Sequence, residues 1–458
     1  MPKRFDAIVI GAGQSGPSLA VRLAQSGQSV ALIEREHLGG TCVNDGCIPT
    51  KTLVASARVA YLARRAADFG VHVGGVSIDM KAVKARKDAV VGQSIDSLTS
   101  WLEGTPNLTL FRGKGVFTGD REVTVNGEAL TAPKIFINTG GRPTIPEWPG
   151  LTDVPYLTNT SMMGLDVVPE HLIIAGGSYI GLEFAQMYRR FGSRVTVLEY
   201  GDRLIGREDP EVSEAVQAIL EGEGVEVRLG VRDFAVAEEA GAIRLTATIE
   251  GAPLSLDGSH LLLAVGRKPN VEALKLEAAG VALDARGYIA VDDSLQTNVA
   301  GVWAIGDVNG RGAFTHTSYN DYEIVAGDLL DGDNRRVSDR IQAYALYVDP
   351  PLARIGMNES EARKSGRRVL KGYLPMTRVG RARERGETEG FMQVLIDAET
   401  RLILGAALLG IEADEVVHCL LDVMYAKAPY TVIQRAVHIH PTVSELVPTM
   451  LGDLKPLD

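Results

Sequence analysis

Two parts of the chain repeat one order of apolar and polar positions. The first has an apolar run at Phe5–Ile10, apolar residues at helical spacing over 17–26, and another apolar run at Val30–Ile33. Short apolar runs bounded by glycine are typical of buried strands, and a 3.6-residue apolar period is typical of a helix. The pattern therefore predicts a strand–turn–helix–strand unit in each part. The corresponding runs of the second part are Leu172–Ala175, Leu182–Phe191 and Val195–Leu198.

A glycine-rich turn joins the first strand to the helix in each unit. The first glycine of such a turn permits a tight bend, the second admits a pyrophosphate, and the third lets helix and strand pack closely. The helix N-terminus then presents free N–H groups to phosphate. A plain turn explains one such motif as well as a nucleotide site does, but two copies in matching context predict two bound dinucleotides. The turns read Gly11-Ala12-Gly13-Gln14-Ser15-Gly16 and Gly176-Gly177-Ser178-Tyr179-Ile180-Gly181.

Each unit ends in an acidic residue that suits the ribose of a dinucleotide. Glu34 and Glu199 each lie 23 positions after the first glycine of their turn. A carboxylate at this place bonds a free 2′-hydroxyl and repels a 2′-phosphate, so Glu199 favours NAD(H) over NADP(H). Arg203 and Arg207 lie nearby in the sequence and keep NADP(H) as the alternative. Ser178 replaces the middle glycine of the second turn and narrows the approach to its backbone.

Composition narrows the class of protein. A length of 458 residues suggests about three domains at roughly 150 residues each, and 45% apolar with 23% charged residues excludes a disordered chain or a disulfide scaffold. The formal charge of −11 gives no general attraction to nucleic acid or anionic lipid. Only three cysteines occur, no export signal is evident, and no stretch approaches the roughly 20 apolar residues of a membrane helix. We expect a cytoplasmic protein with no nucleic-acid or membrane partner.

Two of the three cysteines lie in one glycine-rich segment, Gly39–Lys51. Cys42 and Cys47 follow the first acidic residue closely, so we expect them near the first nucleotide. Residues five apart in an ideal helix are separated by about 7.5 Å along its axis, whereas a disulfide needs Cα atoms within roughly 7 Å. A bridge therefore requires a distorted turn, which Gly46 and Pro49 allow, and two unbridged thiols are the alternative. No second cysteine pair is present to complete a zinc site, so we expect no metal.

Five motifs resemble the pyridine-nucleotide-disulfide oxidoreductases, the family of dihydrolipoamide dehydrogenase, glutathione reductase and mercuric reductase. They are the cysteine segment Gly39–Lys51, then Ile137–Pro143, Ala264–Asn270, Val302–Asp307 and His438–Glu445. The resemblance implies an α/β fold with two Rossmann-like dinucleotide-binding domains, for FAD and NAD, and a C-terminal α+β dimerisation domain. The expected boundaries are 1–145 for the first part of the FAD-binding domain, 146–266 for the NAD(P)-binding domain, 267–338 for the central FAD-binding part and 339–458 for the dimerisation domain.

The resemblance also implies how electrons would pass through the protein. Hydride from NADH would reduce FAD, and the flavin would reduce a disulfide between Cys42 and Cys47. Cys47 would lie against the flavin, and Cys42 would be the thiol that attacks the substrate. His440, oriented by Glu445, would be the proton partner of the other subunit's cysteines, so that a homodimer completes the active site.

The other implied residues would contact the cofactors. Lys51 and Glu183 would form a pair near the reactive edge of the flavin. Tyr179 matches an aromatic residue that covers the nicotinamide pocket in some members of the family, although packing on the turn explains it equally well. The expected contacts are Gly11, Gly13, Gly16, Glu34, Gly40, Thr41, Thr139, Gly140 and Asp307 for FAD, and Gly176, Tyr179, Gly181, Glu199 and Gly266 for the nicotinamide dinucleotide.

Signals for the substrate point in two directions. Thr50 and Glu199 resemble lipoamide-type enzymes more than glutathione reductases, whereas Asp45 and Ser178 depart from the lipoamide type. The segment Phe314–Ser318 resembles a mercuric-reductase-like branch that includes the reactive-chlorine-resistance copper reductases. The leading hypothesis is an FAD-dependent NAD(P)H oxidoreductase acting on a small-molecule or lipoyl disulfide. The alternatives are a Cu or Hg ion reductase, a glutathione-type reductase and, more distantly, a non-catalytic flavoprotein redox sensor.

Overall fold

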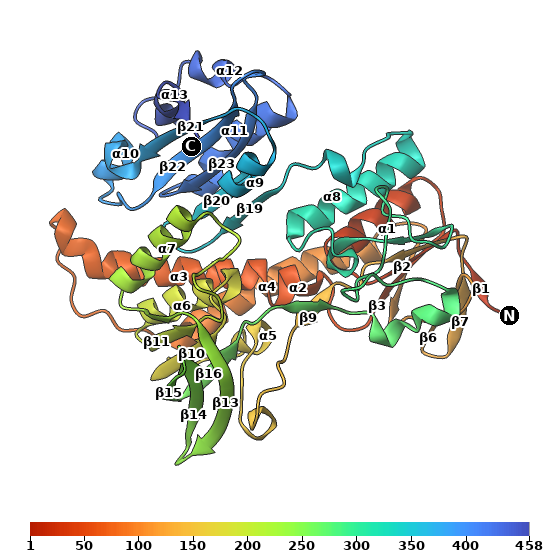
Figure 1. The fold of residues 1–458 in the computed structure, drawn as a ribbon. Coiled ribbons are helices and arrows are strands. Elements are labelled where there is room, and N and C mark those ends of the chain that lie inside the picture. Colours follow the sequence, from red (N-terminus) through yellow and green to blue (C-terminus); the bar gives the residue numbers. More distant parts are fainter. Residues whose placement is uncertain (458) are drawn as a thin grey trace.

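The computed structural model describes residues 1–457, which form three lobes around a central groove (Figure 1). The N-terminal segments and the cyan segment around α8 (Thr315–Ala326) share one lobe. The green segments that follow the second glycine turn form another lobe, and the blue C-terminal strands form the third. The first lobe is therefore assembled from stretches of chain that flank the second lobe in the sequence.

A five-stranded parallel sheet, in the order β18-β8-β2-β3-β4, organises the first lobe. One face packs against the apolar sides of α1 and α8, and the other packs against a small sheet. Both faces of the central strand β2 are buried, and its sequence is continuously apolar, as is typical of parallel sheets, whereas the edge strand β4 is partly exposed and contains polar residues. The strands are β2 (Ala7–Ile10), β3 (Val30–Glu34), β4 (Leu108–Arg112), β8 (Lys134–Ile137) and β18 (Val302–Ala304).

The first lobe also contains helices and a second sheet that has the order β1-β7-β6-β5. Its helices, besides α8, are α1 (Ser15–Gln25), α2 (Gly40–Asn44), α3 (Cys47–Arg65) and α4 (Met80–Glu103). The strands of the small sheet are β1 (Lys3–Arg4), β5 (Val116–Gly119), β6 (Glu122–Val125) and β7 (Glu128–Thr131). The break between α2 and α3 falls between the two cysteines.

The second lobe repeats the parallel architecture, with the strand order β12-β11-β10-β16. Its strands are β10 (His171–Ala175), β11 (Arg194–Leu198), β12 (Glu226–Arg228) and β16 (His260–Leu263). Its helices are α5 (Asn159–Met162), α6 (Tyr179–Phe191) and α7 (Pro210–Gly222). An antiparallel sheet of β13 (Val231–Glu239), β14 (Ala242–Ile249) and β15 (Ala252–Gly258) extends from it, and β9 (Gly141–Pro143) pairs with β17 (Arg267–Pro269).

The third lobe is built on a six-stranded antiparallel sheet, in the order β19-β20-β23-β22-β21-β24. Its strands are β19 (Ala343–Leu346), β20 (Leu352–Gly356), β21 (Val369–Pro375), β22 (Phe391–Asp397), β23 (Ile403–Leu409) and β24 (Lys455–Pro456). Its helices are α9 (Glu359–Lys364), α10 (Gly380–Glu384), α11 (Ala413–Tyr425), α12 (Thr431–Gln434) and α13 (Val447–Leu451). Leu346, Leu352 and Phe391 pack into the same apolar core as α6, which joins this lobe to the second.

The observed architecture confirms the predicted α/β class and both repeated units. The helices begin earlier than the apolar period indicates, at Ser15 rather than residue 17 and at Tyr179 rather than Leu182. The reason is that the first helical turn follows the glycine bend directly, where polar and small residues carry no periodic apolar signal. The domain boundaries stay a prediction. Within residues 1–457, none of the helices is both long and apolar enough to pass through a bilayer.

Candidate functional site

The first glycine turn has a backbone that only glycine can adopt. Gly11 has φ +106°, and a Cβ atom there would lie 2.3 Å from the carbonyl oxygen of Asn138. A Cβ atom on Gly16 would lie 2.1 Å from the carbonyl oxygen of Gly11. Both distances are far inside van der Waals contact, so α1 can approach β2 this closely only without side chains. The N-terminus of α1 is thereby brought to the edge of the parallel sheet.

The second turn reproduces this geometry closely. Gly176 has φ +112°, with the Ala264 carbonyl oxygen 2.3 Å from the position of a Cβ atom. A Cβ atom on Gly181 would lie 2.1 Å from the Gly176 carbonyl oxygen. Ser178 has extended backbone angles, φ −114° and ψ −173°, which any residue can adopt. The serine therefore leaves the backbone path of the turn intact, and the two turns are equivalent dinucleotide cradles.

The acidic residues at the ends of the units are held in the same way. A carboxylate oxygen of Glu34 accepts a hydrogen bond of 2.7 Å from the backbone N–H of Ala12. Glu199 accepts the corresponding bond, of 2.6 Å, from Gly177. The acid thus braces its own turn and lies at the strand end where a ribose would reach it.

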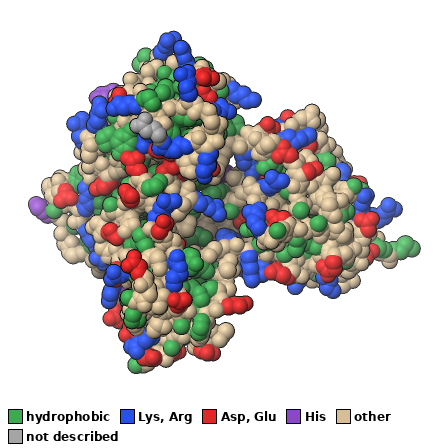
Figure 2. Space-filling view, viewed as in Figure 1, with side chains coloured by type: hydrophobic (Ala, Val, Ile, Leu, Met, Phe, Trp, Pro, Cys, Tyr) green, Lys and Arg blue, Asp and Glu red, His purple; other side chains and the backbone are tan. Residues whose placement is uncertain are grey.

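A cavity of about 1460 Å³ opens beside the first turn and extends to the second lobe. Its volume exceeds the roughly 300–1,000 Å³ typical of ligand pockets, which fits an elongated ligand. On the face shown in Figure 2, several Lys and Arg side chains flank the hollow between the lobes. The expected site residues that line the cavity are Gly11, Gly13, Glu34, Gly40, Thr41, Cys42, Cys47, Lys51, Thr139, Gly140, Tyr179, Glu183 and Asp307. The expected site residues outside its lining are Gly16, Gly176, Gly181, Glu199, Gly266, His440 and Glu445.

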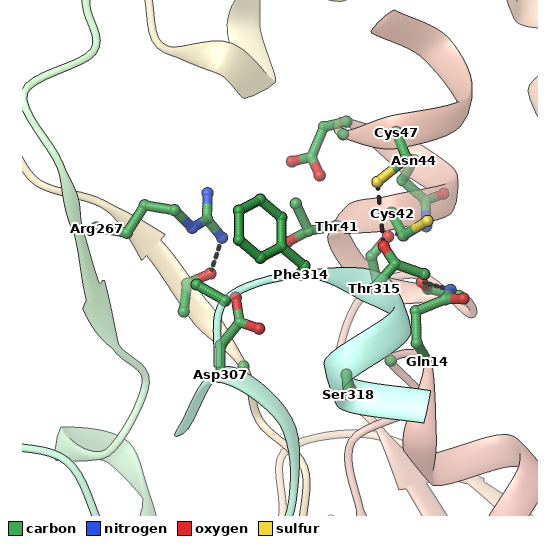
Figure 3. Close-up of a pocket in the computed structure, with 18 of the residues that line it drawn as sticks. Gln14, Thr41, Cys42, Asn44, Cys47, Arg267, Asp307, Phe314, Thr315 and Ser318 are labelled. Atoms are coloured by element: carbon green, nitrogen blue, oxygen red, sulfur yellow. Dashed lines mark hydrogen bonds between the residues drawn. The ribbon is translucent and has the colours of Figure 1, made fainter. Parts of the chain in front are cut away.

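The two cysteines meet at the break between α2 and α3. Asp45 and Gly46 leave the helical conformation, so the distortion expected for this segment is present. Both cysteines are thiols in this structure, and each shifts the pKa of the other. The Cys47 sulfur also lies 3.1 Å from the hydroxyl oxygen of Thr315, at the N-terminus of α8 (Figure 3).

The contact between the thiols separates their pKa values. The hydrogen bond from Cys42, helped by Thr315 and by the charge of Lys51, lowers the pKa of Cys47 to about 6 against the opposing effect of burial. The same hydrogen bond, together with burial, raises the pKa of Cys42. At neutral pH the reduced pair therefore carries its charge on Cys47 and its proton on Cys42. A thiolate is the reactive form of cysteine, so the pair is chemically polarised.

Lys51 and Glu183 form an ion pair across two lobes. The Lys51 Nζ atom lies 2.9 and 2.8 Å from the carboxylate oxygens of Glu183. The same ammonium lies 4.6 Å from the ring centroid of Tyr347, whose backbone N–H donates to Glu183. The sequence expectation that these two residues meet is confirmed, and the pair stands one helical turn beyond Cys47 on α3.

Asp307 tests whether a flavin dinucleotide fits the cavity. It lies in the 3-10 turn Gly306–Asn309 and points into the cavity, near Phe314 (Figure 3). No side chain among residues 1–457 donates a hydrogen bond to its carboxylate, and burial raises its pKa. A polyol chain would supply the missing donors, so the residue fits the ribityl chain of FAD. The Arg267 guanidinium, which donates to the carbonyl oxygen of Gly141, stands nearby.

His440 and Glu445 are the expected residues that this chain does not bring to the cysteines. The Nδ1 atom of His440 lies 2.8 Å from a Glu445 carboxylate oxygen, so the expected pairing is present. The His440 side chain is 79% exposed and does not line the cavity of its own chain. Its contact with the cysteines of another subunit stays a prediction.

Sequence reasoning missed a second group of residues in the cavity wall and directly behind it. Thr315 reaches Cys47, and the rings of Phe314 and Tyr344 pack against Tyr179. Glu208 accepts a hydrogen bond of 2.6 Å from the Tyr344 hydroxyl. Phe314 and Thr315 lie in the segment Phe314–Ser318, and Glu208 lies in Arg207–Pro210; both segments resemble mercuric-reductase-like proteins. No sequence signal marks Tyr344, because its contact with Glu208 is made between lobes.

Comparisons with known proteins agree with this geometry. The family model "Pyridine nucleotide-disulphide oxidoreductase" matches residues 5–321, and the dimerisation domain of the same family matches residues 342–451. The chain is 36% identical to the probable pyridine nucleotide-disulfide oxidoreductase RclA of Escherichia coli, over 96% of this chain and 97% of that protein. It is 32% identical to a mercuric reductase of Bacillus cereus, over 90% of this chain and 66% of the other. A dihydrolipoyl dehydrogenase of Chlamydia muridarum is also 32% identical, over 97% and 96%.

A solved structure is similar over the whole chain. The Cu(II) complex of the HOCl-induced flavoprotein disulfide reductase RclA from Escherichia coli superposes with a TM-score of 0.90. The sequences are 34% identical, and 99% of each chain is covered. Together with the family matches, this likeness confirms the two dinucleotide-binding units and the C-terminal dimerisation domain, which indicates a homodimer.

Proposed function

The chain belongs to the pyridine nucleotide-disulphide oxidoreductases, and from that membership we propose that it is an NADH-dependent disulfide reductase in which Cys42 attacks the substrate. FAD and NAD(P)H are the cofactors of the family, and FAD, when bound, carries two electrons from the nicotinamide to the cysteine pair. The observation that carries the proposal is the position of Cys42 and Cys47 on either side of the break between α2 and α3, in the wall of a dinucleotide-sized cavity.

The unequal pKa values give the two thiols different tasks. Cys42 keeps its proton until a base removes it, and the resulting thiolate attacks one sulfur of the substrate disulfide. That S–S bond breaks, and the first product leaves as a thiol after taking up a proton. The Cys47 thiolate then attacks the Cys42 sulfur, which forms the Cys42–Cys47 disulfide and releases the second product as a thiolate that takes up a proton from water. Two electrons have passed from the cysteine pair to the substrate.

His440 supplies the proton chemistry in this proposal. Its Nδ1 atom is engaged by Glu445, which leaves Nε2 as the atom that exchanges protons. Since the ring is exposed and lies outside the cavity of its own chain, it acts on Cys42 of the partner subunit. A homodimer, as the dimerisation domain indicates, is then a condition for catalysis.

Lys51 places a positive charge at the same end of the cavity. Glu183 holds the ammonium through two hydrogen bonds, and the Tyr347 ring lies over it. The ammonium lowers the pKa of Cys47, and it would also stabilise negative charge on a reduced flavin. Loss of Lys51 would therefore weaken both the thiolate and electron transfer into the pair.

Reduction of Cu(II) is the second candidate. The similar RclA structure is described as a Cu(II) complex, and thiolates are soft ligands that favour Cu(I) over Cu(II). In that reaction each of two Cu(II) ions takes one electron from the pair of thiolates, which becomes a disulfide. Both reactions use the same cysteine pair. The two candidates are therefore distinguished by which acceptor the enzyme reduces.

Steady-state turnover with NADH and NADPH tests the proposal. Lipoamide, oxidised glutathione, Cu(II) and Hg(II) are compared as acceptors, and a quinone dye reports electron transfer that needs no cysteine. Cys42→Ser is expected to lower disulfide turnover by about a thousandfold or more, because the nucleophile is lost, while dye reduction continues.

Cys419→Ser is the matched control, since Cys419 lies in α11 and outside the cavity lining. Its activity is expected to equal that of the natural protein. Retained disulfide turnover in Cys42→Ser would contradict the assignment of that thiol. Turnover of Cu(II) without turnover of any disulfide would select the second candidate.

A further inference from the structure

One buried carboxylate links the second glycine turn to the third lobe. Glu208, in the loop that precedes α7, is 3% exposed. Its Oε1 atom accepts hydrogen bonds from two tyrosine hydroxyls, of 2.6 Å from Tyr344 and 3.3 Å from Tyr179. Its Oε2 atom accepts two more, of 2.9 and 2.6 Å, from the guanidinium of Arg354. All hydrogen-bonding capacity of this carboxylate is thereby engaged by side chains that come from two lobes.

Arg354 fixes the carboxylate in place. It is 2% exposed, and it also donates a hydrogen bond of 2.8 Å to Asp209. Tyr344 and Arg354 are directly opposite each other in the β19–β20 pair, so the sheet of the third lobe presents both to Glu208. One guanidinium faces two carboxylates, and the two hydroxyl donors help to satisfy the remaining negative charge.

The two tyrosines belong to a ring cluster, Tyr179, Phe314 and Tyr344, which lines the cavity. The rings of Phe314 and Tyr344 are stacked, with centroids 5.4 Å apart, and Tyr179 meets both edge-on at 6.1 and 5.5 Å. Tyr179 is part of the second turn itself, one helical turn before Glu183. A nicotinamide that extends from this turn towards the cysteine side of the cavity has to pass the ring cluster.

We propose that Glu208 is a positioning residue that latches the Tyr179 and Tyr344 rings across the path of the nicotinamide. The closed ring cluster is the resting state, and nicotinamide binding has to release the hydroxyls from Glu208. Arg354 makes the latch rigid by holding the carboxylate from the third lobe. The inference rests on nicotinamide binding at the second turn and is independent of which acceptor the enzyme reduces.

The latch has a measurable consequence for affinity. The apparent affinity of such a site is proportional to the fraction of molecules in which it is open, so a site that is closed most of the time binds its ligand more weakly. Removal of a latching hydroxyl should raise that fraction. It should therefore tighten the binding of NAD⁺, which carries the nicotinamide ring. ADP-ribose occupies the same turn without that ring and should be unaffected.

The experiment measures dissociation constants of NAD⁺ and ADP-ribose by calorimetry on the oxidised, flavin-loaded dimer. Tyr344→Phe and Tyr179→Phe keep the rings and remove only the hydroxyls. We expect each to bind NAD⁺ more tightly than the natural protein, roughly threefold to tenfold for Tyr344→Phe as one hydrogen bond to a charged group is lost, with ADP-ribose within twofold. Glu208→Gln should act in the same direction, and the tyrosine variants decide the matter if that variant does not fold.

Tyr188→Phe is the matched control, because Tyr188 is a fully buried tyrosine of the same helix whose hydroxyl has no partner among residues 1–457. It should leave both constants unchanged. Unaltered or weaker NAD⁺ binding in Tyr344→Phe would overturn the latch. A parallel change in NAD⁺ and ADP-ribose would also overturn it, since the hydroxyls would then act on the turn as a whole. None of these outcomes depends on acceptor turnover.

Discussion

The two glycine turns have nearly the same backbone and very different surroundings. Their first glycines differ by only a few degrees in φ, +106° and +112°, and each is held against a carbonyl oxygen of a neighbouring strand end. The first turn, however, opens on the sulfur atoms of Cys42 and Cys47, whereas the second opens on the Tyr179 ring. The shared backbone geometry of the two turns therefore suits both to bind a dinucleotide, and the elements packed around each turn decide what the bound dinucleotide can do.

The difference follows from which parts of the chain reach each turn. Helices α2 and α3 and the N-terminus of α8 bring thiols and a hydroxyl to the first. Strands β19 and β20 bring Tyr344 and Arg354 to the second. In our proposals, the first turn serves electron transfer to sulfur, and the residues beside the second turn control access of the nicotinamide.

The largest expected effects on dinucleotide binding come from filling the third glycine of either turn. Gly16→Ala places a methyl group 2.1 Å from the Gly11 carbonyl oxygen, and Gly181→Ala does the same at Gly176. Relief of such a clash costs about 3 kcal/mol, or roughly a hundredfold in affinity. Gly16→Ala should purify with little flavin, as measured by its visible absorbance. Gly181→Ala should keep the flavin and lose NAD⁺ binding by calorimetry.

Gly222→Ala is the control for this pair, since a Cβ atom there meets nothing within 4 Å. Loss of flavin from Gly181→Ala, or of NAD⁺ affinity alone from Gly16→Ala, would show that the two cradles have been assigned in the wrong order.

A smaller effect is expected from the acids that end the units. Glu199→Ala removes the carboxylate that favours a free 2′-hydroxyl, so the preference for NADH over NADPH should fall by about tenfold, the effect of one hydrogen bond to a charged group. Glu34→Ala makes the equivalent change beside the first turn and should leave that preference unchanged. Ratios of kcat/KM for the two nucleotides measure the effect, and an equal shift in both variants would contradict separate sites.

The smallest effect concerns Thr315, which acts on the first site alone. Its hydroxyl lowers the pKa of Cys47, so Thr315→Val should raise that pKa above its value of about 6. The thiolate is the reactive form of cysteine. As the pH is lowered towards 6, the alkylation rate of Cys47 should therefore begin to fall at a higher pH in the reduced variant than in the natural protein. Thr315→Ser retains the hydroxyl and should show the same pH profile as the natural protein. If Thr315→Val also showed the natural profile, the Thr315 hydroxyl would have no effect on the pKa of Cys47.

Much of the site was predictable because the signals for it are local. Cys42 and Cys47 lie in one glycine-rich segment, and the expected break between them is present at Asp45 and Gly46. The pairing of Lys51 with Glu183 was implied by family resemblance, and the structure brings the two residues together. The roles of these residues, and of His440 in a second subunit, stay predictions.

The sequence by itself determined the two glycine turns. A tight turn of positive φ followed by close helix packing leaves no room for a Cβ atom. Such a turn therefore requires glycine at fixed spacing, and that spacing is visible in the sequence. Only the tertiary structure decided which side chains act at each cradle. Thr315 meets Cys47 across 268 positions of chain, and Tyr344 meets Glu208 across 136. Such contacts depend on how lobes pack, and packing between distant segments has no periodic or spaced signature that a single sequence displays.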